Sequence, residues 1–276
     1  MEIIFFREIF GTNIRYIKTM YKLLIQKIIR IINLILFKKE LPTKISIYFH
    51  DISNKEINEL EKIIIYFLNL GFKFVTMNNF QKKIFSDEKL FAITFDDGFS
   101  SWTKTLDLFK KYDVKATYYL NTIQFTDDEM TKFLQDIRCT NPDFIIKKEE
   151  VQELINSDHE IGSHTHSHKT LSKISLDDLK TEIETNLQIL SKFNVEISNF
   201  AIPYGMRRLI NKEQIAYLLE VFDSISFGEP GMLFNHEKQK IQRYPWRIEK
   251  TFQYNLNNIS TNTSLFNKVT KRSGLG

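Results

Sequence analysis

The sequence lacks the features that mark several common classes of protein. Cys139 is the only cysteine among 276 residues, so an intrachain disulfide is excluded, and this residue belongs to no metal-binding pattern. The formal net charge is only +4, and part of it falls in the N-terminal segment, so no basic stripe for nucleic acid is indicated. Internal repeats and long low-complexity runs are also missing. With 42% apolar and 26% charged residues, the chain has the composition of an ordinary globular protein with one large domain.

The chain divides into three parts by composition. Residues 1–40 are apolar and basic, residues 41–250 alternate between strand-like and helix-like segments, and residues 251–276 form a polar C-terminal tail that we expect to be loosely ordered. The predicted strands of the middle part lie near 45–49, 72–76, 91–95, 116–121, 160–163, 199–202 and 224–227. The predicted helices lie near 54–70, 101–112, 147–157, 175–193 and 211–220. Strands that alternate with helices imply a parallel sheet, and therefore the α/β class.

Two adjacent carboxylates end the third predicted strand. Asp96 and Asp97 follow an apolar, β-prone run and precede Gly98. Neighbouring side chains at the end of a strand point different ways unless the backbone turns, and a glycine permits such a turn. One carboxylate can then bind a metal ion while the other stays free as a base. A plain polar turn is the alternative, because Asp and Gly are common turn formers.

A histidine-rich segment follows the fifth predicted strand. His164, His166 and His168 are half of the six histidines of the chain. Imidazole is the commonest protein metal ligand near neutral pH, and two imidazoles with one carboxylate make a three-ligand site of the catalytic type. A polar loop is the alternative for this segment alone. Because a strand-terminal Asp pair is present as well, metal binding is the favoured interpretation of the two segments together.

A stiff turn follows the sixth predicted strand. Pro203 and Gly205 bracket Tyr204, and such a turn can present a backbone N–H to a developing oxyanion. Taken alone, this segment is better explained as an ordinary Pro-x-Gly turn. All three segments follow strands, so we expect them to cluster at the carboxyl ends of the strands, where barrel active sites lie.

Three motifs in this order resemble the first three motifs of the NodB-like polysaccharide deacetylases, carbohydrate esterase family 4. They are Thr94-Phe95-Asp96-Asp97-Gly98, His164-Thr165-His166-Ser167-His168 and Phe200-Ala201-Ile202-Pro203-Tyr204-Gly205. The early stretch Tyr48-Phe49-His50-Asp51 is similar to the same family, and the resemblance covers roughly residues 41–250. It implies a distorted parallel (β/α) barrel of about seven strands.

The resemblance also implies a role for each matching residue. Asp97, His164 and His168 would bind a divalent metal ion, usually zinc in this family. Asp96 would be the catalytic base, and the backbone N–H of Tyr204 would help to hold the oxyanion. The residue types suit this chemistry, because a divalent ion lowers the pKa of its water and a neighbouring carboxylate can take the proton.

Two features depart from the family pattern. Ala201 stands where the third motif often has an Arg that pairs with the base, so the candidates for the partner of Asp96 are Arg207, Arg208, Arg243 and Arg247. The late Leu-x-His motif that supplies a general acid is not evident either. His236 is the only late histidine and could fill that role, with a solvated loop residue as the alternative.

Two segments outside the motifs also need an interpretation. From Met20 to Phe37, polar residues recur every three or four positions in a stretch rich in Leu, Ile and Phe. This pattern predicts an amphipathic helix in a membrane surface, in preference to a helix packed on the barrel or on another subunit. No small-residue cleavage site follows it, so a secretory signal peptide is a poor match. The irregular stretch from Gln124 to Asp143 is predicted to be a surface insertion, in preference to a lid or substrate loop.

The sequence therefore predicts a metal-dependent carbohydrate N-deacetylase that acts on an N-acetylated sugar in a polysaccharide or a lipid-linked glycan. The expected cofactor is a divalent ion such as Zn2+, and the general acid would be His236 or a water at the metal. Hydrolysis of a small non-peptide amide, or glycan binding by a catalytically lapsed protein, are the alternatives. We expect no nucleic-acid partner, and a location in the cytoplasm or peripherally at the inner membrane, with the cell surface and the periplasm left open.

Overall fold

The computed structural model describes residues 41–126, 128–229 and 239–260, so the predicted amphipathic segment and His236 lie outside the described residues. Residues 42–255 form one compact unit, and the description below concerns this unit. Among the described residues, no helix has both the length and the apolar character that are needed to cross a membrane.

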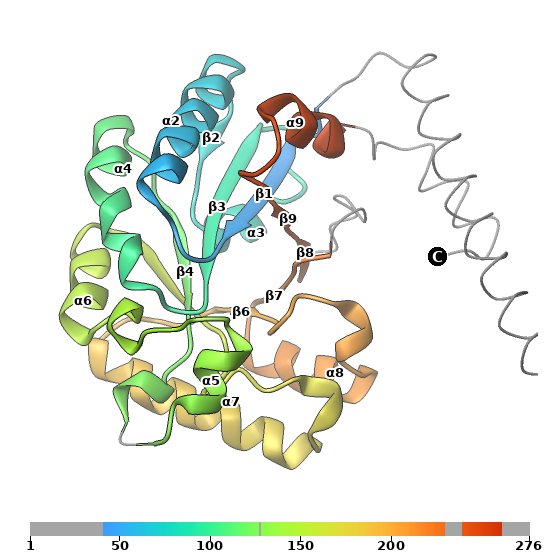
Figure 1. Cartoon of the computed structure of the whole chain (residues 1–276). Helices are drawn as coiled ribbons and strands as arrows, with labels where there is room; N and C mark the ends of the chain where they lie inside the picture. The colour runs from blue at the N-terminus through green and yellow to red at the C-terminus, as the bar shows by residue number, and fades with distance from the viewer. Residues whose placement is uncertain (1–40, 127, 230–238, 261–276) are drawn as a thin grey trace, which may run out of the picture. The chain divides into compact units, whose positions relative to one another are not determined.

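The compact unit is built on one sheet of nine strands, all paired in parallel (Figure 1). The strands are β1 (Lys44–Phe49), β2 (Lys73–Phe74), β3 (Leu90–Asp96), β4 (Thr117–Leu120), β5 (Glu160–Ser163), β6 (Asn199–Ala201), β7 (Ser224–Phe227), β8 (Lys240–Gln242) and β9 (Tyr244–Pro245). Their spatial order is β8-β7-β6-β5-β4-β3-β1-β9, with β2 beside β3. The α/β class and the parallel sheet that the sequence predicts are confirmed.

The sheet curls into a nearly closed barrel. Its two edge strands, β8 and β9, are separated along the chain by Arg243 alone, so the two edges must lie close together. Hydrogen bonds also cross the interior. Ser46 Oγ donates to the carbonyl of Gln242 at 2.8 Å, and Tyr48 Oη donates to the carbonyl of Gly228 at 3.0 Å. These bonds tie β1 to β8 and to the residue that follows β7.

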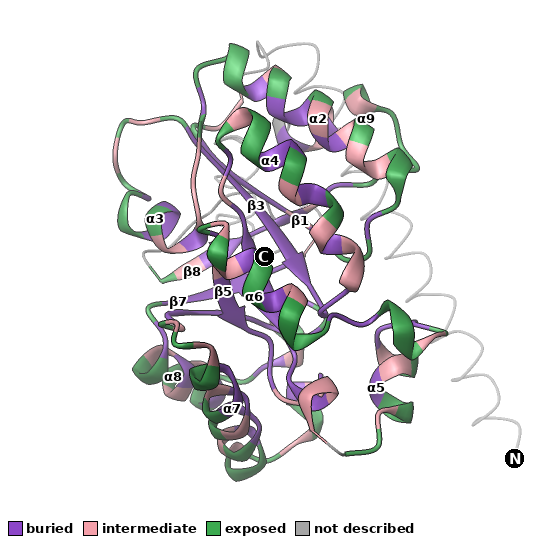
Figure 2. Cartoon of the chain, turned by 90° about the vertical axis from the view of Figure 1, so that its left-hand side faces the viewer, coloured by how far each residue is buried: buried purple, intermediate pink, exposed green. Residues whose placement is uncertain are grey.

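Helices surround the barrel with one side buried against the strands (Figure 2). The helices are α2 (Asn54–Asn69), α3 (Met77–Lys82), α4 (Leu106–Tyr112), α5 (Thr131–Asp136), α6 (Lys148–Asn156), α7 (Leu176–Leu190) and α8 (Lys212–Val221). A further helix, α9 (Phe252–Ser260), begins in the last residues of this unit. In α2, the buried residues Leu60, Ile63, Ile64 and Phe67 recur at helical spacing and face the core. The strands between the helices are almost entirely buried, as parallel strands covered on both faces must be.

The predicted elements are confirmed, and several short ones are added. All seven predicted strands and all five predicted helices are present within a few residues of their expected bounds. The additions are α3, α5, β8, β9 and α9, none longer than nine residues. The first residues of the predicted polar tail are thus helical, because α9 covers Phe252–Ser260. The N-terminus of α7 is capped by Ser175, whose Oγ accepts the backbone N–H of Asp178 at 3.1 Å.

The barrel interior is packed so tightly that Gly162 has no room for a side chain. A Cβ at this position would lie 2.5 Å from the ring of Tyr119, which is fully buried on the neighbouring strand. We therefore expect Gly162→Ala to lower the free energy of unfolding by about 1–3 kcal/mol, measured by chemical denaturation. The same change in a Tyr119→Leu background should cost less, because the ring is what the new methyl group meets. An equal cost in both backgrounds would contradict this account.

Candidate functional site

The end of β3 sends its two carboxylates to different partners. Asp96 is the last residue of the strand, and the next two residues, Asp97 and Gly98, have φ angles of 82° and 81°. The backbone therefore makes a left-handed turn directly after Asp96, which is the turn that the sequence predicts Gly98 to permit. Both carboxyl groups are buried, and each has its own set of neighbours.

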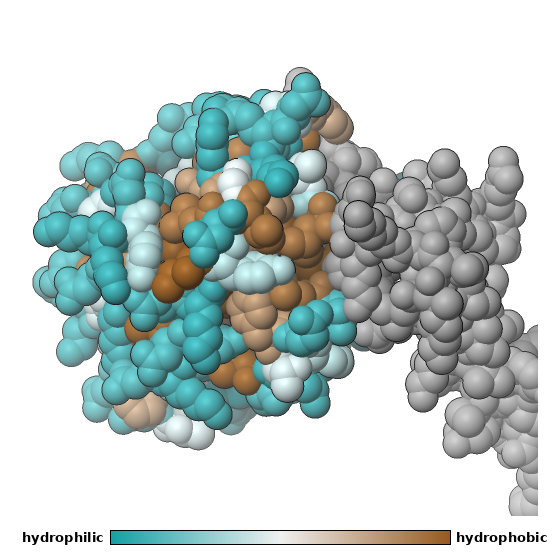
Figure 3. All heavy atoms as spheres, turned by 90° about the horizontal axis from the view of Figure 1, so that it is seen from above, coloured by the Kyte–Doolittle hydropathy of each residue, from teal (hydrophilic) through white to brown (hydrophobic). Residues whose placement is uncertain are grey.

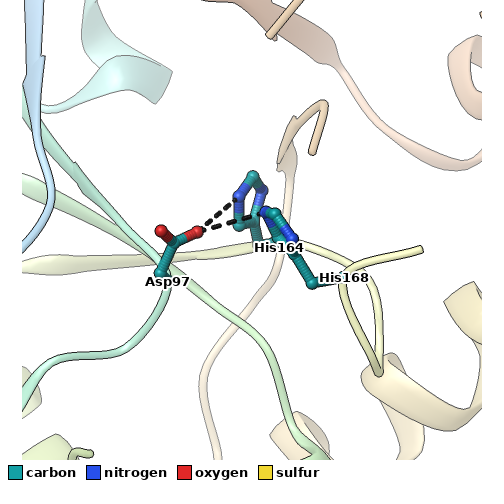
Figure 4. Close-up of side chains that lie close together, drawn as sticks. All are labelled: Asp97, His164 and His168. Atoms are coloured by element: carbon teal, nitrogen blue, oxygen red, sulfur yellow. Dashed lines mark ion pairs between the residues drawn. The ribbon is translucent and has the colours of Figure 1, made fainter. Parts of the chain in front are cut away.

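Asp97 faces two histidines (Figure 4). Its Oδ1 lies 3.2 Å from Nε2 of His164 and 3.3 Å from Nε2 of His168. The ligand atoms of the three residues lie within 4.8 Å of one another, and all three residues are buried. The ligand group that the resemblance implies is therefore brought together, by loops that follow β3 and β5.

The chemistry of this group fits a bound cation. Burial alone would raise the pKa of Asp97, but the His168 and His164 imidazoles outweigh it and hold this pKa well below its usual range. The carboxylate therefore stays negative. Asp97 Oδ1 is nevertheless buried without a hydrogen bond of good geometry. Because His164 Nδ1 contacts the carbonyl of Ala201 at 2.8 Å and donates its proton there, its Nε2 is left as a free ligand atom.

Side chains from α7 hold the histidine segment in place. The carboxylate of Glu182 accepts the backbone N–H of Ser167 at 2.8 Å and its hydroxyl at 2.7 Å. One helical turn further on, the amide of Asn186 donates to the carbonyl of Thr165 at 2.8 Å. Both α7 residues are buried. They act as outer supports that fix the position of His168 without touching it.

The middle histidine does not belong to the ligand group. His166 Nδ1 lies 3.0 Å from Thr122 Oγ1, and its Nε2 lies 3.3 Å from a carboxylate oxygen of Asp128. It therefore stabilises the loop that follows β4, on the side away from Asp97.

Asp96 is clamped by Arg243. Nη1 of the arginine donates to Oδ1 at 2.6 Å and Nη2 donates to Oδ2 at 2.8 Å, a bidentate pair in which the arginine is only 1% exposed. Burial would lower the pKa of Arg243, but the Asp96 carboxylate outweighs it and raises this pKa. The guanidinium also lies 5.0 Å from the ring centre of Tyr48 and 4.9 Å from that of Tyr119. Of the four arginines that the sequence offers, Arg243 is the partner.

The third motif forms a turn at the edge of the same site. Tyr204 has a φ angle of 63° and Gly205 one of 68°, and the Gly205 N–H donates to the carbonyl of Ile202 at 2.9 Å. A Cβ on Gly205 would lie 2.7 Å from the backbone of Gly228, so only glycine fits there. The ring of Tyr204 lies 4.7 Å from that of His168, which places the turn beside the ligand group.

Backbone strain is concentrated in these three motifs. Among the described residues, eight that are not glycine have a positive φ angle, and four of them are Asp97, Thr165, His168 and Tyr204. Such conformations cost of order 1–3 kcal/mol each and persist only where the surrounding structure enforces them. Their concentration in the three motifs marks this region as functional.

The motifs open into one cavity of about 570 Å³. One wall is the segment from Asp136 to Thr140, which begins at the last residue of α5, and the half-exposed ring of Phe144 also lines the cavity. The segment is anchored by the buried Phe133 and Ile137. The prediction that Gln124–Asp143 is a plain surface insertion is therefore wrong. Its irregular sequence gave no sign that its far end folds back over the strand ends.

His50 is a site residue to which the sequence assigned no role. It follows β1, is half-exposed on the cavity wall, and its Nε2 lies 3.8 Å from Asp97 Oδ2. Its position directly after a strand is the signal that could have identified it, because the other site residues share that position. His236, the predicted general acid, lies outside the described residues, so its role stays a prediction.

Comparisons with known proteins agree with this geometry. A family model described as polysaccharide deacetylase matches residues 84–219. The chain belongs to the polysaccharide deacetylase family. A peptidoglycan-N-acetylglucosamine deacetylase from Bacillus cereus is 32% identical over 117 residues, which are 41% of this chain and 36% of that protein. A bifunctional xylanase/deacetylase from Pseudobutyrivibrio xylanivorans is 28% identical over 43% of this chain and 17% of that protein. The chain thus spans less than half the length of these relatives.

Solved structures support the fold. The Streptococcus pyogenes deacetylase PplD has a TM-score of 0.62 at 17% identity, over 78% of this chain and 97% of that one. A de-N-acetylase from Aggregatibacter actinomycetemcomitans has a TM-score of 0.61 at 12% identity, over 78% and 98% of the two chains. At these identities the likeness concerns the fold of the barrel alone, and it confirms the predicted fold.

The ligand group makes a prediction about metal content. We expect Asp97→Ala, His164→Ala and His168→Ala each to lower zinc affinity at least about a hundredfold. This loss is larger than the usual effect of removing a residue that only hydrogen-bonds to a ligand. The metal content after dialysis, measured by atomic emission, tests this. His166→Ala is the matched control and should keep the metal. Stoichiometric zinc in the His168→Ala protein would exclude this ligand set.

A second prediction concerns the Arg243 clamp. Arg243→Met leaves the Asp96 charge buried without a partner, so we expect a loss of about 3–5 kcal/mol in the free energy of unfolding. The double variant Asp96→Asn/Arg243→Met should regain most of it, because no unpaired charge is left. Equal stability of the single and double variants would show that the pair is unimportant for folding. Thermal and urea denaturation measure both.

Proposed function

We propose that this protein is a metal-dependent hydrolase that removes N-acetyl groups from an N-acetylated sugar in a glycan. The observation that carries the proposal is that the two carboxylates at the end of β3 have different partners. Asp97 faces two imidazoles, whereas Asp96 is held by Arg243 at the same cavity. One carboxylate is thus placed to ligate a cation and the other to move a proton.

Each residue of the site has a separate role in the proposed reaction. A divalent ion held by Asp97, His164 and His168 would polarise the amide and lower the pKa of water. Asp96 is positioned to take the proton of the attacking water, because Arg243 fixes the plane of its carboxylate. The N–H of Tyr204, on the turn beside His168, is the proposed donor to the oxygen that becomes negative. His236 is the proposed donor of the proton that the leaving amine takes up.

The cavity suits a sugar ring. About 570 Å³ is within the usual range of small-ligand pockets. Phe144 is 54% exposed and Tyr204 38% exposed, although both line the cavity, and exposed aromatic faces there can pack against the apolar face of a pyranose. The Bacillus cereus relative, which by name acts on N-acetylglucosamine in peptidoglycan, supports the same class of substrate. A lipid-linked glycan is the alternative carrier of the sugar.

The alternative, a protein that has lost catalytic activity and only binds glycans, is less well supported. A protein that only binds glycans needs neither a buried ligand group nor a clamped carboxylate, and both cost stability through burial of charge. Here Asp96, Asp97, His164 and His168 are all in place.

The catalytic base provides the direct test. Asp96→Asn keeps an amide oxygen as an acceptor for Arg243 but leaves the guanidinium charge unpaired, so we expect it to be less stable and still to fold and retain metal. Its release of acetate from N-acetylglucosamine oligomers should be at least about a hundredfold slower, the usual scale for loss of a general base. Acetate release and metal content are measured on the same preparation. Near-normal turnover in this variant would rule out the role of Asp96.

A further inference from the structure

Exposed apolar side chains occur at the end of the barrel that lies opposite the cavity, as well as at the cavity itself. Eight large apolar side chains are exposed among the described residues, and half of them belong to α2, its C-terminal cap or the turn after α3. These four are Ile65, Leu68, Leu70 and Phe85. Phe85 is the most exposed of all, at 73%, and lies in the turn between α3 and β3. Exposed apolar side chains that lie together can mark an interaction site, whereas single ones need no explanation.

Hydrogen bonds join these elements at one end of the barrel. Lys89 Nζ donates to the carbonyl of Leu70 at 2.9 Å, which joins the approach to β3 to the end of α2. Lys44 Nζ donates to the carbonyl of Ser86 at 2.6 Å, which joins the turn to the start of β1. Figure 3 looks at the molecule from the side on which β1 and β3 begin, and it shows apolar residues gathered next to hydrophilic ones. We call this surface, from residues 65–73 and 82–89, the Phe85 face.

The Phe85 face is basic as well as apolar. Four of its lysines are exposed, against two acidic residues, Asp87 and Glu88. The four are Lys73, Lys82, Lys83 and Lys89. Glu88 pairs with Lys73 at 2.6 Å and with Lys83 at 3.0 Å, which leaves a net positive charge around the exposed ring. An aromatic side chain at the centre and lysines around it match the boundary between acyl chains and anionic headgroups.

The position at which the N-terminal segment joins the barrel also favours a lipid bilayer. β1 begins at Lys44, so the apolar and basic residues 1–40 join the barrel at the end where the Phe85 face lies. The catalytic residues lie at the other end of β3. That strand runs for seven residues from Leu90 to Asp96, or about 20 Å at the usual rise per residue.

We propose that the Phe85 face docks the barrel on an anionic lipid bilayer, with Phe85 at the acyl boundary and the lysines among the headgroups. The catalytic cavity then faces away from the bilayer. This inference is independent of the reaction, because it rests on the end of the barrel that contributes nothing to the cavity.

A tryptophan reporter tests the docking in the full chain. Trp102 and Trp246 are both buried, so they give a constant background. Phe85→Trp should show a blue-shifted emission with vesicles of phosphatidylcholine and phosphatidylglycerol, and brominated lipid should quench it. Val221→Trp, at an exposed apolar site on α8, is the matched control and should not respond. Vesicle binding by the Phe85→Trp protein without any change in its emission would overturn the proposal, because another part of the chain would then make the contact.

The same reporter separates the other occupants of the face. If residues of the chain itself cover the face, the indole introduced by Phe85→Trp will be protected from acrylamide before vesicles are added, which contradicts the proposal. If the face binds a protein instead, the introduced indole will not respond to vesicles of any composition, which contradicts it equally.

Substitutions then test the lysines and the apolar ring of the Phe85 face separately. Lys82→Glu/Lys83→Glu should weaken binding to the anionic vesicles at least about tenfold in roughly 0.1 M salt, since each lysine near such a surface contributes about fivefold. Phe85→Ser should weaken it also at high salt, where charge is screened. The matched controls are Lys104→Glu/Lys212→Glu and Val221→Ser, at exposed positions elsewhere. All these variants should keep wild-type acetate release from a soluble oligosaccharide. Unchanged vesicle affinity in the Phe85 and lysine variants would refute the proposal whether or not the protein is a deacetylase.

Discussion

The buried ion pair between Asp96 and Arg243 links the closure of the barrel to the chemistry of its site. Arg243 is the single residue between the two edge strands, β8 and β9, and its guanidinium reaches across to the end of β3. Two charges in the interior are stable only when geometry and further hydrogen bonds compensate for lost water. Here Thr94 Oγ1 accepts another N–H of the arginine at 2.9 Å, and the rings of Tyr48 and Tyr119 flank the cation. Burial raises the pKa of Tyr48 to about 12, so that neighbour stays neutral. The interaction that orients the proposed base therefore also ties the connection between the two edge strands to the end of β3.

Most of the fold follows from local pattern. Alternating apolar strands and amphipathic helices predict the parallel sheet, because each long element has to bury one face. The elements that the sequence did not predict are short and lack a periodic signal of their own. The strands β8 and β9 have three and two residues, and β9 ends in Pro245, which is disfavoured in central strands. They form because the rest of the barrel offers open edges, which is tertiary information that no short window of sequence contains.

The site could be predicted only where its residues lie in sequence motifs. Asp96, Asp97, His164 and His168 follow or end predicted strands, so their meeting follows from the topology of a parallel sheet. Arg243 was one of four arginines that could equally be the partner of Asp96. The choice between them needed the position of β8, a strand that the sequence does not reveal. His50 was missed for a different reason. It lies 3.8 Å from Asp97 without a close hydrogen bond, and a single histidine after a strand has many structural uses. The cavity wall after α5 was missed because an irregular segment does not show where it folds back.

The two ends of β3 limit what the protein can reach. All seven residues of this strand are buried, so it acts as a rigid spacer between Leu90 and Asp96. If the Phe85 face docks on a bilayer, the cavity is held about 20 Å or more from the headgroups. A sugar joined directly to a lipid phosphate could not span that distance, whereas a residue within a longer chain could. The two proposals taken together therefore favour a polymeric glycan, or a long lipid-linked one, over a short precursor. The membrane then serves to concentrate the enzyme near the polymer, and the cavity selects the sugar.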